Sequence, residues 1–414
     1  MNVLIVSTNR NQFPMPVIPV GACMVAEAAA RAGHRVRFLD LMFEHGALNA
    51  LESELDEHTP DIVGLSLRNI DNNDMGSPSF YVKDLIPFVE TTRRKTGAVI
   101  VLGGAAVSVM PEELLRYTGA DLAVTGDGET VFTELLERIS GNLSIRYLPG
   151  ISWIEEDEFR TNASAPPSDS YHCWTPYFHR WIDVKSYRNK MTTVPIQTKL
   201  GCHFGCVYCT YRKIEGNRYR LSNPEEVVTT ISDLDSMGFK HIEFVDNVFN
   251  SPYSHALSIC ESLAKCRRHI SLQSLEMNPL FIDDEIMSAM ERAGFSGLGV
   301  TVESASDEVL GGLGKGFNAG HVYRAAEVIR RHKMPCMWIF MMGGPNETEE
   351  TVNETLKFAE KHISPRDAAF FGLGVRIYPG TELESISRRQ GLLSLSPQEM
   401  LEPVFYMSPT VDYS

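Results

Sequence analysis

The chain has 414 residues, which is enough for two domains, and 43% of them are hydrophobic, as in ordinary globular proteins. Its 38 Lys and Arg against 53 Asp and Glu give a formal net charge of -15, which disfavours nucleic acid as a partner. The start of the chain lacks a signal peptide's basic flank and cleavage site, and no apolar stretch approaches the ~20 residues of a membrane span, so we expect a cytoplasmic protein with reduced thiols.

Residues 1–150 predict a doubly wound domain of Rossmann type. The buried-strand pattern of residues 2–8 is followed by an Ala-rich helical segment that ends at Gly33. Strands that recur with helices between them indicate a parallel sheet with right-handed crossovers. Residues 148–158 are typical of a closing strand or hairpin. The other strands are predicted at 34–41, 61–67, 98–104 and 121–126.

Glycine-rich strand ends in this domain indicate a ligand site. No G-x-G-x-x-G pattern follows the first strand, so a dinucleotide is not expected. The long, Pro-rich loop at residues 7–21 suits a flat and bulky ligand better than a pyrophosphate. Each glycine pair could be a plain turn, but together they lie at the edge where doubly wound folds bind ligands. The candidates are Gly103, Gly104, Gly126, Asp127, Gly128 and Glu129.

The second half of the chain predicts a partial barrel. Residues 151–190 are expected to form a linker, because Pro, Ser and aromatic residues accumulate there with little periodicity. Residues 191–385 alternate strands with helices, and 386–414 form a C-terminal tail. Six βα units fall short of the eight that close a barrel, and chemistry is expected at the carboxyl ends of the strands. The strands are predicted at 194–199, 241–246, 271–277, 297–303, 336–342 and 370–378.

Three cysteines follow the first of these strands: Cys202, Cys206 and Cys209, in the segment GCHFGCVYCTYRK at 201–213. Thiolates are soft ligands that suit zinc or iron–sulfur clusters. A structural zinc site should have a fourth Cys or His nearby, and His203 adjoins Cys202 too closely to reach the same ion. The spacing therefore favours a [4Fe–4S] cluster with one iron left open for a substrate or cofactor. The other five cysteines are scattered, and we expect them to be small buried hydrophobes.

The cysteine loop resembles the cluster loop of the radical S-adenosylmethionine (SAM) enzymes. Residues 299–317, 340–348 and 376–383 are similar to segments of the subgroup with an N-terminal cobalamin-binding domain, and the resemblance covers nearly the whole chain. It implies an α/β chain with a doubly wound cobalamin-binding domain and a partial (β/α)6 radical SAM barrel. The implied cofactors are a [4Fe–4S] cluster, SAM and cobalamin. The implied partners are a small-molecule substrate and an external one-electron reductant such as flavodoxin or ferredoxin.

The resemblance also implies contacts to SAM, whose amino and carboxylate groups chelate the open iron in this family. Tyr208 is expected near the adenine, unless it is a plain core aromatic. Asp246 stands where the family often has a Gly-Gly-Glu turn at the SAM amino group, a pattern from which this sequence departs. Glu303 and Ser304 end the fourth barrel strand and are expected at the ribose, although Glu303 could instead form a salt bridge at the rim. Gly343 and Gly344 would let the backbone approach the cofactor, or only form a turn.

For cobalamin, the resemblance implies that the glycine-rich strand ends of the first domain cradle the nucleotide tail and the corrin edge. The segment 66–75, with Ser66, Arg68 and Asn69, is expected to face the lower side of the corrin, the alternative being a solvated loop. Many cobalamin domains carry Asp-x-His-x-x-Gly, whose His binds cobalt. The nearest string here, at 56–61, precedes a strand and lacks the glycine. We therefore expect no histidine on cobalt.

These expectations lead to a cobalamin-dependent radical SAM methyltransferase. One SAM would methylate cob(I)alamin, and a second would yield the deoxyadenosyl radical that activates an otherwise unreactive carbon for methylation. The alternative is a cyclisation or rearrangement that uses both cofactors without net methylation. A methylthiotransferase would need a second cysteine trio in the first domain, where Cys23 is the sole cysteine. An iron–sulfur sensor or binding module is the non-enzymatic alternative.

Overall fold

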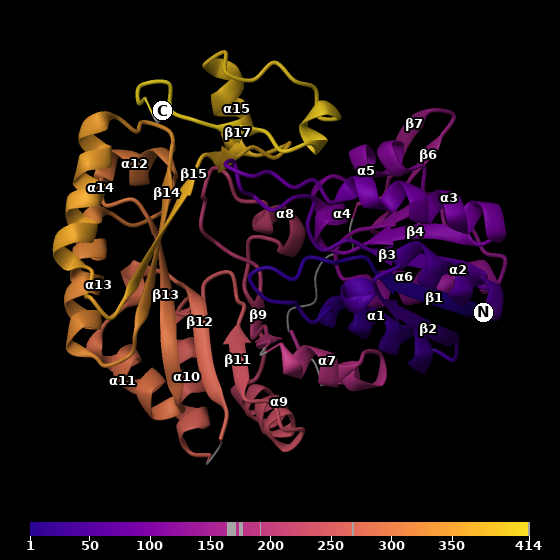
Figure 1. The fold of residues 1–414 in the computed structure, drawn as a ribbon, viewed down its shortest axis with the longest axis horizontal. Coiled ribbons are helices and arrows are strands. Elements are labelled where there is room, and N and C mark those ends of the chain that lie inside the picture. The colour runs from indigo at the N-terminus through magenta and orange to yellow at the C-terminus, as the bar shows by residue number, and fades with distance from the viewer. Residues whose placement is uncertain (164–170, 174–176, 191, 267–268, 413–414) are drawn as a thin grey trace.

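The computed structural model describes residues 1–163, 171–173, 177–190, 192–266 and 269–412. The first domain contains the predicted doubly wound sheet (Figure 1). Its strand order is β2-β1-β3-β4-β5-β6-β7, and the first five of these strands in sheet order are parallel. The order reverses between β1 and β3, and this switch point is where ligands of such folds bind. The strands are β1 (Asn2–Ser7), β2 (Arg35–Asp40), β3 (Ile62–Ser66), β4 (Val99–Gly103), β5 (Leu122–Val124), β6 (Ile151–Glu155) and β7 (Glu158–Thr161).

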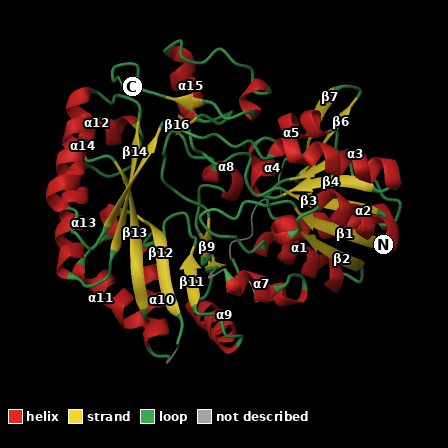
Figure 2. Ribbon diagram, in the orientation of Figure 1, coloured by secondary structure: helices red, strands yellow, loops and turns green. Residues whose placement is uncertain are grey.

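Helices cover both faces of this sheet (Figure 2). Leu4 and Val6 of β1 pack in a core with α2 and α3, whereas Val3 and Ile5 pack on the other face with α1 and α6. This alternation explains why the strands are nearly uniformly apolar. The hairpin expected at 148–158 is β6–β7, which is antiparallel to β5. The helices are α1 (Val20–Arg31), α2 (Ala47–His58), α3 (Leu85–Lys95), α4 (Ala105–Val109), α5 (Pro111–Thr118) and α6 (Gly128–Ser140).

A connecting segment packs between the two domains. Its described part contains η3 (Tyr177–Arg180) and α7 (Val184–Asn189). Arg180 Nη1 contacts both carboxylate oxygens of Glu27 on α1, at 2.8 and 2.9 Å, and the Tyr187 hydroxyl donates to Asp40 Oδ2 at 2.7 Å. Phe178 and Tyr187 belong to a core that also includes Ile18 of the first domain and the helices of the second. The two domains therefore share packed side chains.

The second domain is a six-stranded, fully parallel sheet in chain order, β8-β11-β12-β13-β14-β15, with open edges at β8 and β15. The predicted partial barrel of six strands is thus confirmed. Helices line its outer face (Figure 2). The strands are β8 (Val194–Ile196), β11 (His241–Phe244), β12 (Ser271–Met277), β13 (Phe295–Glu303), β14 (Cys336–Met342) and β15 (Ala368–Leu373). The helices are α9 (Pro224–Ser236), α10 (Tyr253–Ala264), α11 (Asp284–Ala293), α12 (Asp307–Gly312), α13 (Ala319–Arg331) and α14 (Glu349–His362).

The end of the chain differs from the predicted single strand at 370–378. Gly374, at φ +77°, turns the chain after β15, and β16 (Val375–Arg376) then pairs antiparallel with β17 (Phe405–Tyr406). With α15 (Glu382–Arg389), this segment encloses a small apolar core that includes Leu383 and Met400. The short 3₁₀ helices are η1 (Leu41–Phe43), η2 (Val82–Asp84), η4 (Pro279–Phe281) and η5 (Glu399–Leu401).

Two further sequence expectations can be compared with the structure. Among the described residues, no helix is long and apolar enough to cross a bilayer. Of the five cysteines expected to be buried, Cys266 is exposed, because it follows the exposed end of α10. The buried four are Cys23, Cys173, Cys260 and Cys336.

Candidate active site

The cysteine loop lies between β9 (Lys199–Leu200) and α8 (Tyr211–Glu215), and β9 pairs with β10 (Arg220–Leu221). Gly201 has φ +89°, and a Cβ there would lie 2.0 Å from the Arg218 carbonyl oxygen, so the turn requires glycine. Glu215 Oε2 accepts from the Gly201 N–H at 2.9 Å, and the Cys202 N–H donates to Gly216 O at 3.2 Å. These bonds join the two ends of the loop.

The three thiols of this loop lie within electrostatic range of one another. Cys202 is buried, whereas Cys206 and Cys209 are partly exposed. Burial, with Cys206 and Cys202 adding to it, raises the pKa of Cys209 to about 11, so metal binding must displace its proton. Within the described ranges, no three His, Cys, Asp or Glu side chains converge on one ion. Three thiolates on one loop could each bind a different iron of a cubane cluster.

Tyr208, Glu303 and Lys315 form a buried polar cluster beside the loop. Glu303 Oε1 accepts from the Tyr208 hydroxyl at 2.8 Å and from Lys315 Nζ at 3.0 Å, and Lys315 Nζ lies 3.1 Å from the Tyr208 hydroxyl. Burial opposes the charge on Lys315, but Glu303 and Tyr208 hold its pKa above the usual value. Glu303 adopts φ +63°, a costly conformation for a side chain other than glycine. The cluster therefore presents a fixed, compensated carboxylate at the end of β13.

Ser304 does not join this cluster. It is fully buried, and its hydroxyl lies 3.0 Å from Thr355 Oγ1 on α14 and accepts from the Ser306 N–H. Successive residues at a strand end point to opposite faces, so Ser304 faces the helix layer while Glu303 faces Tyr208. This placement differs from the expected contact with the SAM ribose.

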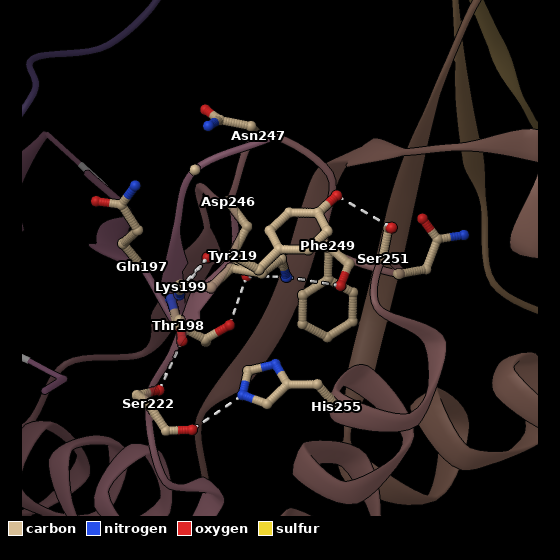
Figure 3. A network of polar contacts seen from close by, with 12 residues as sticks. Gln197, Thr198, Lys199, Tyr219, Ser222, Asp246, Asn247, Phe249, Ser251 and His255 are labelled. Atoms are coloured by element: carbon tan, nitrogen blue, oxygen red, sulfur yellow. Dashed lines mark hydrogen bonds and ion pairs between the residues drawn. The ribbon is translucent and has the colours of Figure 1, made fainter. Parts of the chain in front are cut away.

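Asp246 also differs from its expected role. Its carboxylate is fully buried and accepts from the Thr198 N–H and hydroxyl at 2.6 and 2.7 Å and from Lys199 Nζ at 3.1 Å (Figure 3). Lys199 Nζ also donates to Phe249 O at 3.0 Å, and burial lowers its pKa. Because both carboxylate oxygens are occupied, Asp246 fixes the strand that leads into the cysteine loop and is not free to contact a SAM amino group.

Gly343 and Gly344 lie in the turn after β14. Gly343 has φ +95°, and a Cβ there would lie 2.8 Å from Met407 Sδ. At Gly344, a Cβ would lie 3.2 Å from the Leu313 side chain. Gly343 N–H donates to a carboxylate oxygen of Glu347, and Gly343 O accepts from Ser408 N–H. The positive φ of Gly343 favours glycine there, whereas a side chain at Gly344 would need the Leu313 side chain to shift slightly; the turn they form ends the fifth barrel strand.

Glu276, near the end of β12, is a carboxylate that sequence reasoning missed. It is half-buried, and burial together with the nearby charge of Glu303 raises its pKa to about 7, although Lys315 opposes this. Tyr211 of α8 lies within electrostatic range of Glu276 and also of Arg68 in the first domain. Sequence reasoning also missed Lys199 and Lys315. The available signal was a single Lys in the strand end QTKLG and in the glycine-rich string GLGKG.

The first domain presents its predicted ligand loops to the barrel. Ser66 ends β3 and holds the loop after β1, because its carbonyl accepts from the Thr8 hydroxyl at 2.8 Å. Arg68 and Asn69 follow and are exposed. Helix α8 lies between the two domains (Figure 1), where Lys213 Nζ donates to Val109 O of α4 at 2.9 Å. Helix α8, which follows the cysteine loop, and helix α4, which follows β4, therefore meet at the interface between the domains.

Two of the predicted glycines in this domain are required by backbone geometry. A Cβ on Gly104, at φ +101°, would lie 2.4 Å from Leu67 O, so glycine lets β4 turn beside the loop after β3. Gly126 has φ +82°, whereas a Cβ on Gly103 would meet nothing within 4 Å. Gly128 begins α6 and packs close to Val25.

The acidic candidates beside these glycines have different surroundings. Asp127 forms a two-point ion pair with Arg220 of β10, at 2.9 and 3.3 Å, and thus bridges to the barrel. Glu129 lies in the first turn of α6, where burial raises its pKa.

Two family models match the chain: the B12 binding domain over residues 7–136 and the Radical SAM superfamily over residues 196–359. The chain therefore belongs to the radical SAM enzymes that carry a cobalamin-binding domain. The cofactors of this class are a [4Fe–4S] cluster, SAM and cobalamin, and the three-thiol loop and the switch-point loops described above fit the first and the last of these.

The chain is similar to methyltransferases along most of its length. It is 26% identical to an uncharacterised methyltransferase of Pyrococcus horikoshii (91% of this chain, 79% of that protein) and 22% identical to the tryptophan 2-C-methyltransferase of Streptomyces laurentii (90% and 72%). Its fold matches the structure of the radical SAM methyltransferase TsrM from Kitasatospora setae, solved with cobalamin and a [4Fe–4S] cluster bound. That match has a TM-score of 0.87 and 23% identity, and covers 99% of this chain and 84% of the other.

Proposed function

We propose that this enzyme moves a methyl group from SAM, by way of cobalamin, to an unactivated carbon of a small molecule. The observation that carries the proposal is the contact of α8, which directly follows the cysteine loop, with the first domain: Lys213 Nζ donates to Val109 O at 2.9 Å, and Tyr211 is within electrostatic range of Arg68, after β3. A cluster bound at the cysteine loop and a corrin bound at the strand ends of the first domain would act on one shared substrate space. Such sharing is what methyl transfer through two cofactors requires.

The cluster and SAM would be held by residues of the barrel. Cys202, Cys206 and Cys209 would each bind one iron. Glu303, fixed by Lys315 and Tyr208, would accept hydrogen bonds from the ribose hydroxyls of SAM, and the backbone of the turn at 343–344 would border the cofactor. Because Lys315 neutralises the charge of Glu303, the carboxylate can accept hydrogen bonds from a neutral ligand and still keep its buried counter-charge. The exclusion of water by this buried cluster would protect a reactive species.

Cobalamin would be held by the loops at the switch point of the first sheet. Ser66, Arg68 and Asn69 would face its lower side, and the segments 103–104 and 126–129 would border the corrin edge and nucleotide tail. The segment 66–75 contains no histidine. When bound, the cluster supplies the electron for SAM cleavage and cobalamin carries the methyl group. We expect the cob(II)alamin form of the protein to show no nitrogen superhyperfine splitting from a histidine in its EPR spectrum.

A substrate-free experiment tests the methyl-transfer step. The protein is purified anaerobically, loaded with iron, sulfide and cobalamin, reduced, and given SAM. We expect S-adenosylhomocysteine at about one equivalent per bound cobalamin, because a cobalt in the right place accepts one methyl group. Absence of S-adenosylhomocysteine from corrin-loaded protein would remove methyl transfer from the proposal. Omission of cobalamin is the control and should abolish this product.

Turnover with candidate small molecules then separates the two cofactor-dependent outcomes. Release of both 5′-deoxyadenosine and S-adenosylhomocysteine supports radical methylation. 5′-Deoxyadenosine without S-adenosylhomocysteine would instead support cyclisation or rearrangement. The Cys206→Ala variant should make no 5′-deoxyadenosine. The proposal also includes an external one-electron donor, such as a flavodoxin or ferredoxin, because the sequence has no second cysteine trio for another cluster. It further includes a cytoplasmic location.

A further inference from the structure

The inner face of the barrel sheet, which is the face turned away from the helices, carries a carboxylate at one edge. Glu243 of β11 and Gln273 of β12 are direct neighbours in the parallel register. Glu243 Oε2 accepts from Gln273 Nε2 at 3.2 Å and from the Thr193 hydroxyl, just before β8, at 3.1 Å. Both donors use the same oxygen, and no hydrogen bond from a described residue reaches Oε1. Ile242 and Phe244 lie in the core beneath the helices, so Glu243 between them points to the inner face.

The opposite edge of the same face is apolar. Ile339 of β14 is paired in register with Phe370 of β15, and Met337 lies two residues earlier on β14. Trp338 and Phe340 belong to the core beneath the helices, so Met337 and Ile339 alternate with them and face inward, as Phe370 does beside Ile339. Phe370 is 58% exposed and Met337 is 38% exposed. This edge therefore offers apolar side chains that the described chain leaves uncovered.

Strand β13 lies between the two edges and carries small residues on this face. Gly297 pairs with Gln273 of β12, and Gly299 and Thr301 pair with Met337 and Ile339 of β14. The residues that alternate with them, such as Leu298 and Val300, lie in the core beneath the helices. No bulky side chain of β13 thus separates the carboxylate from the apolar edge.

The charge of the inner face is negative. Glu303 is paired with Lys315 at 3.0 Å, but neither Glu243 nor Glu276 forms an ion pair with any residue that the structure describes. Burial raises the pKa of Glu276 to about 7, and Glu303 and Glu243 add to this effect although Lys315 opposes it. A bound cation would offset this uncompensated charge, whereas a bound anion would be repelled.

We propose that Glu243, held by Thr193 and Gln273, binds an ammonium group of the substrate. The apolar body of the same molecule lies on Met337, Ile339 and Phe370. The substrate class is thus a small amphipathic amine, and acids of the same shape are rejected. This inference rests on the proposed function in one respect, since it places the substrate of that enzyme inside the barrel.

The test is a ligand-observed NMR titration of the reconstituted, unreduced protein with cobalamin and SAM bound. The three probes are phenylbutylamine, phenylbutanol and phenylbutyrate, which share one apolar body and differ in the charge of the end group. The amine should bind most tightly, the alcohol more weakly, and the acid not measurably. Glu243→Gln should lower the affinity for the amine about tenfold, toward that of the alcohol, and leave the alcohol unchanged. Glu261→Gln, at an exposed position of α10, is the matched control.

Two adjacent phenylalanines test the apolar edge. Phe370→Ala should weaken the amine and the alcohol alike, by about fivefold, because both lose the same apolar contact. Phe371 points to the helix side, where its ring stacks on Phe340 with centroids 4.7 Å apart. Phe371→Ala is therefore the matched control and should leave both affinities unchanged.

Equal affinity for the three probes, or no measurable binding of the amine, overturns the proposal. A Glu243→Gln variant that weakens SAM in equilibrium dialysis and leaves the amine unaffected also overturns it, because the carboxylate would then serve the cofactor. If this variant does not fold, the order of the probes on wild type and the Phe370→Ala comparison decide. Normal selectivity for the amine together with absent S-adenosylhomocysteine formation would bear on the proposed function alone.

Discussion

Arg376 and Asp71 form a buried ion pair between the two domains, with Arg376 Nε 2.8 Å from Asp71 Oδ2. Arg376 belongs to β16, and Asp71 lies in the loop after β3 that carries Arg68 and Asn69. Arg376 also donates to Met400 O at 2.9 Å, so its guanidinium joins the C-terminal segment to this loop. The C-terminal segment thus fixes the loop that we expect to face the lower side of cobalamin.

Arg376→Met should cost about 3–5 kcal/mol of unfolding free energy, because it leaves the buried Asp71 carboxylate without a counter-charge. It should also weaken cobalamin binding, since the loop after β3 loses its anchor. Urea unfolding and absorption titration with cobalamin measure the two effects. The matched control is Arg331→Met. Arg331 Nη2 lies 2.7 Å from Asp284 Oδ2 in an ion pair on the surface, so its loss should cost less than about 1 kcal/mol. Equal costs for the two variants would contradict the inferred anchoring role.

Asp246→Asn tests whether this residue supports the cysteine loop or binds SAM. The substitution leaves the buried Lys199 ammonium unpaired, so we expect a loss of about 3–5 kcal/mol in the cofactor-free protein, before SAM is present. The double variant Asp246→Asn/Lys199→Met should recover part of that stability. Chemical denaturation measures both. A stable Asp246→Asn variant with specifically weakened SAM binding would restore the original expectation of a direct contact.

The positions of the strand ends could be predicted from the sequence, whereas the partners of the side chains could not. Runs of apolar residues and glycine stops mark where each strand ends, which is why the cysteine loop and the loop after β3 were both expected at ligand-binding edges. Asp246, however, finds its partner Lys199 47 residues earlier, in β9. Nothing local in the string EFVDN distinguishes a buried structural carboxylate from a free one. The strand predicted at 370–378 failed for a related reason, because Gly374 turns the chain there and β16 then pairs with a segment near the C-terminus.

Gly201→Ala should disrupt the cysteine loop. A methyl group there would lie 2.0 Å from Arg218 O at a backbone φ of +89°, so we expect a loss of about 3 kcal/mol or more and poor cluster assembly. Gly205→Ala, in the same loop, is the matched control, since its nearest atom would be the flexible end of Arg212 at 3.7 Å. Iron and sulfide bound per chain after reconstitution, together with the melting temperature, compare the two. Full iron uptake by Gly201→Ala would show that the turn is not required.

Glu276 should make the stability of the cofactor-free protein depend on pH between its unfolded and folded pKa values. Its folded pKa of about 7 lies above the usual 4.5 of a glutamate, so the folded state binds the extra proton and stability falls as pH rises through this window. Glu276→Gln removes that dependence. The free energy of unfolding of the variant minus that of wild type should therefore rise by about 1–3 kcal/mol between pH 5 and pH 8. One pKa unit corresponds to about 1.4 kcal/mol, and partial exposure of the carboxylate screens the effect. Denaturant unfolding at several pH values, under reducing conditions, measures the difference. Glu90→Gln, at an exposed position of α3, is the matched control. A Glu276→Gln curve that runs parallel to wild type would contradict a raised pKa of this carboxylate in the folded protein.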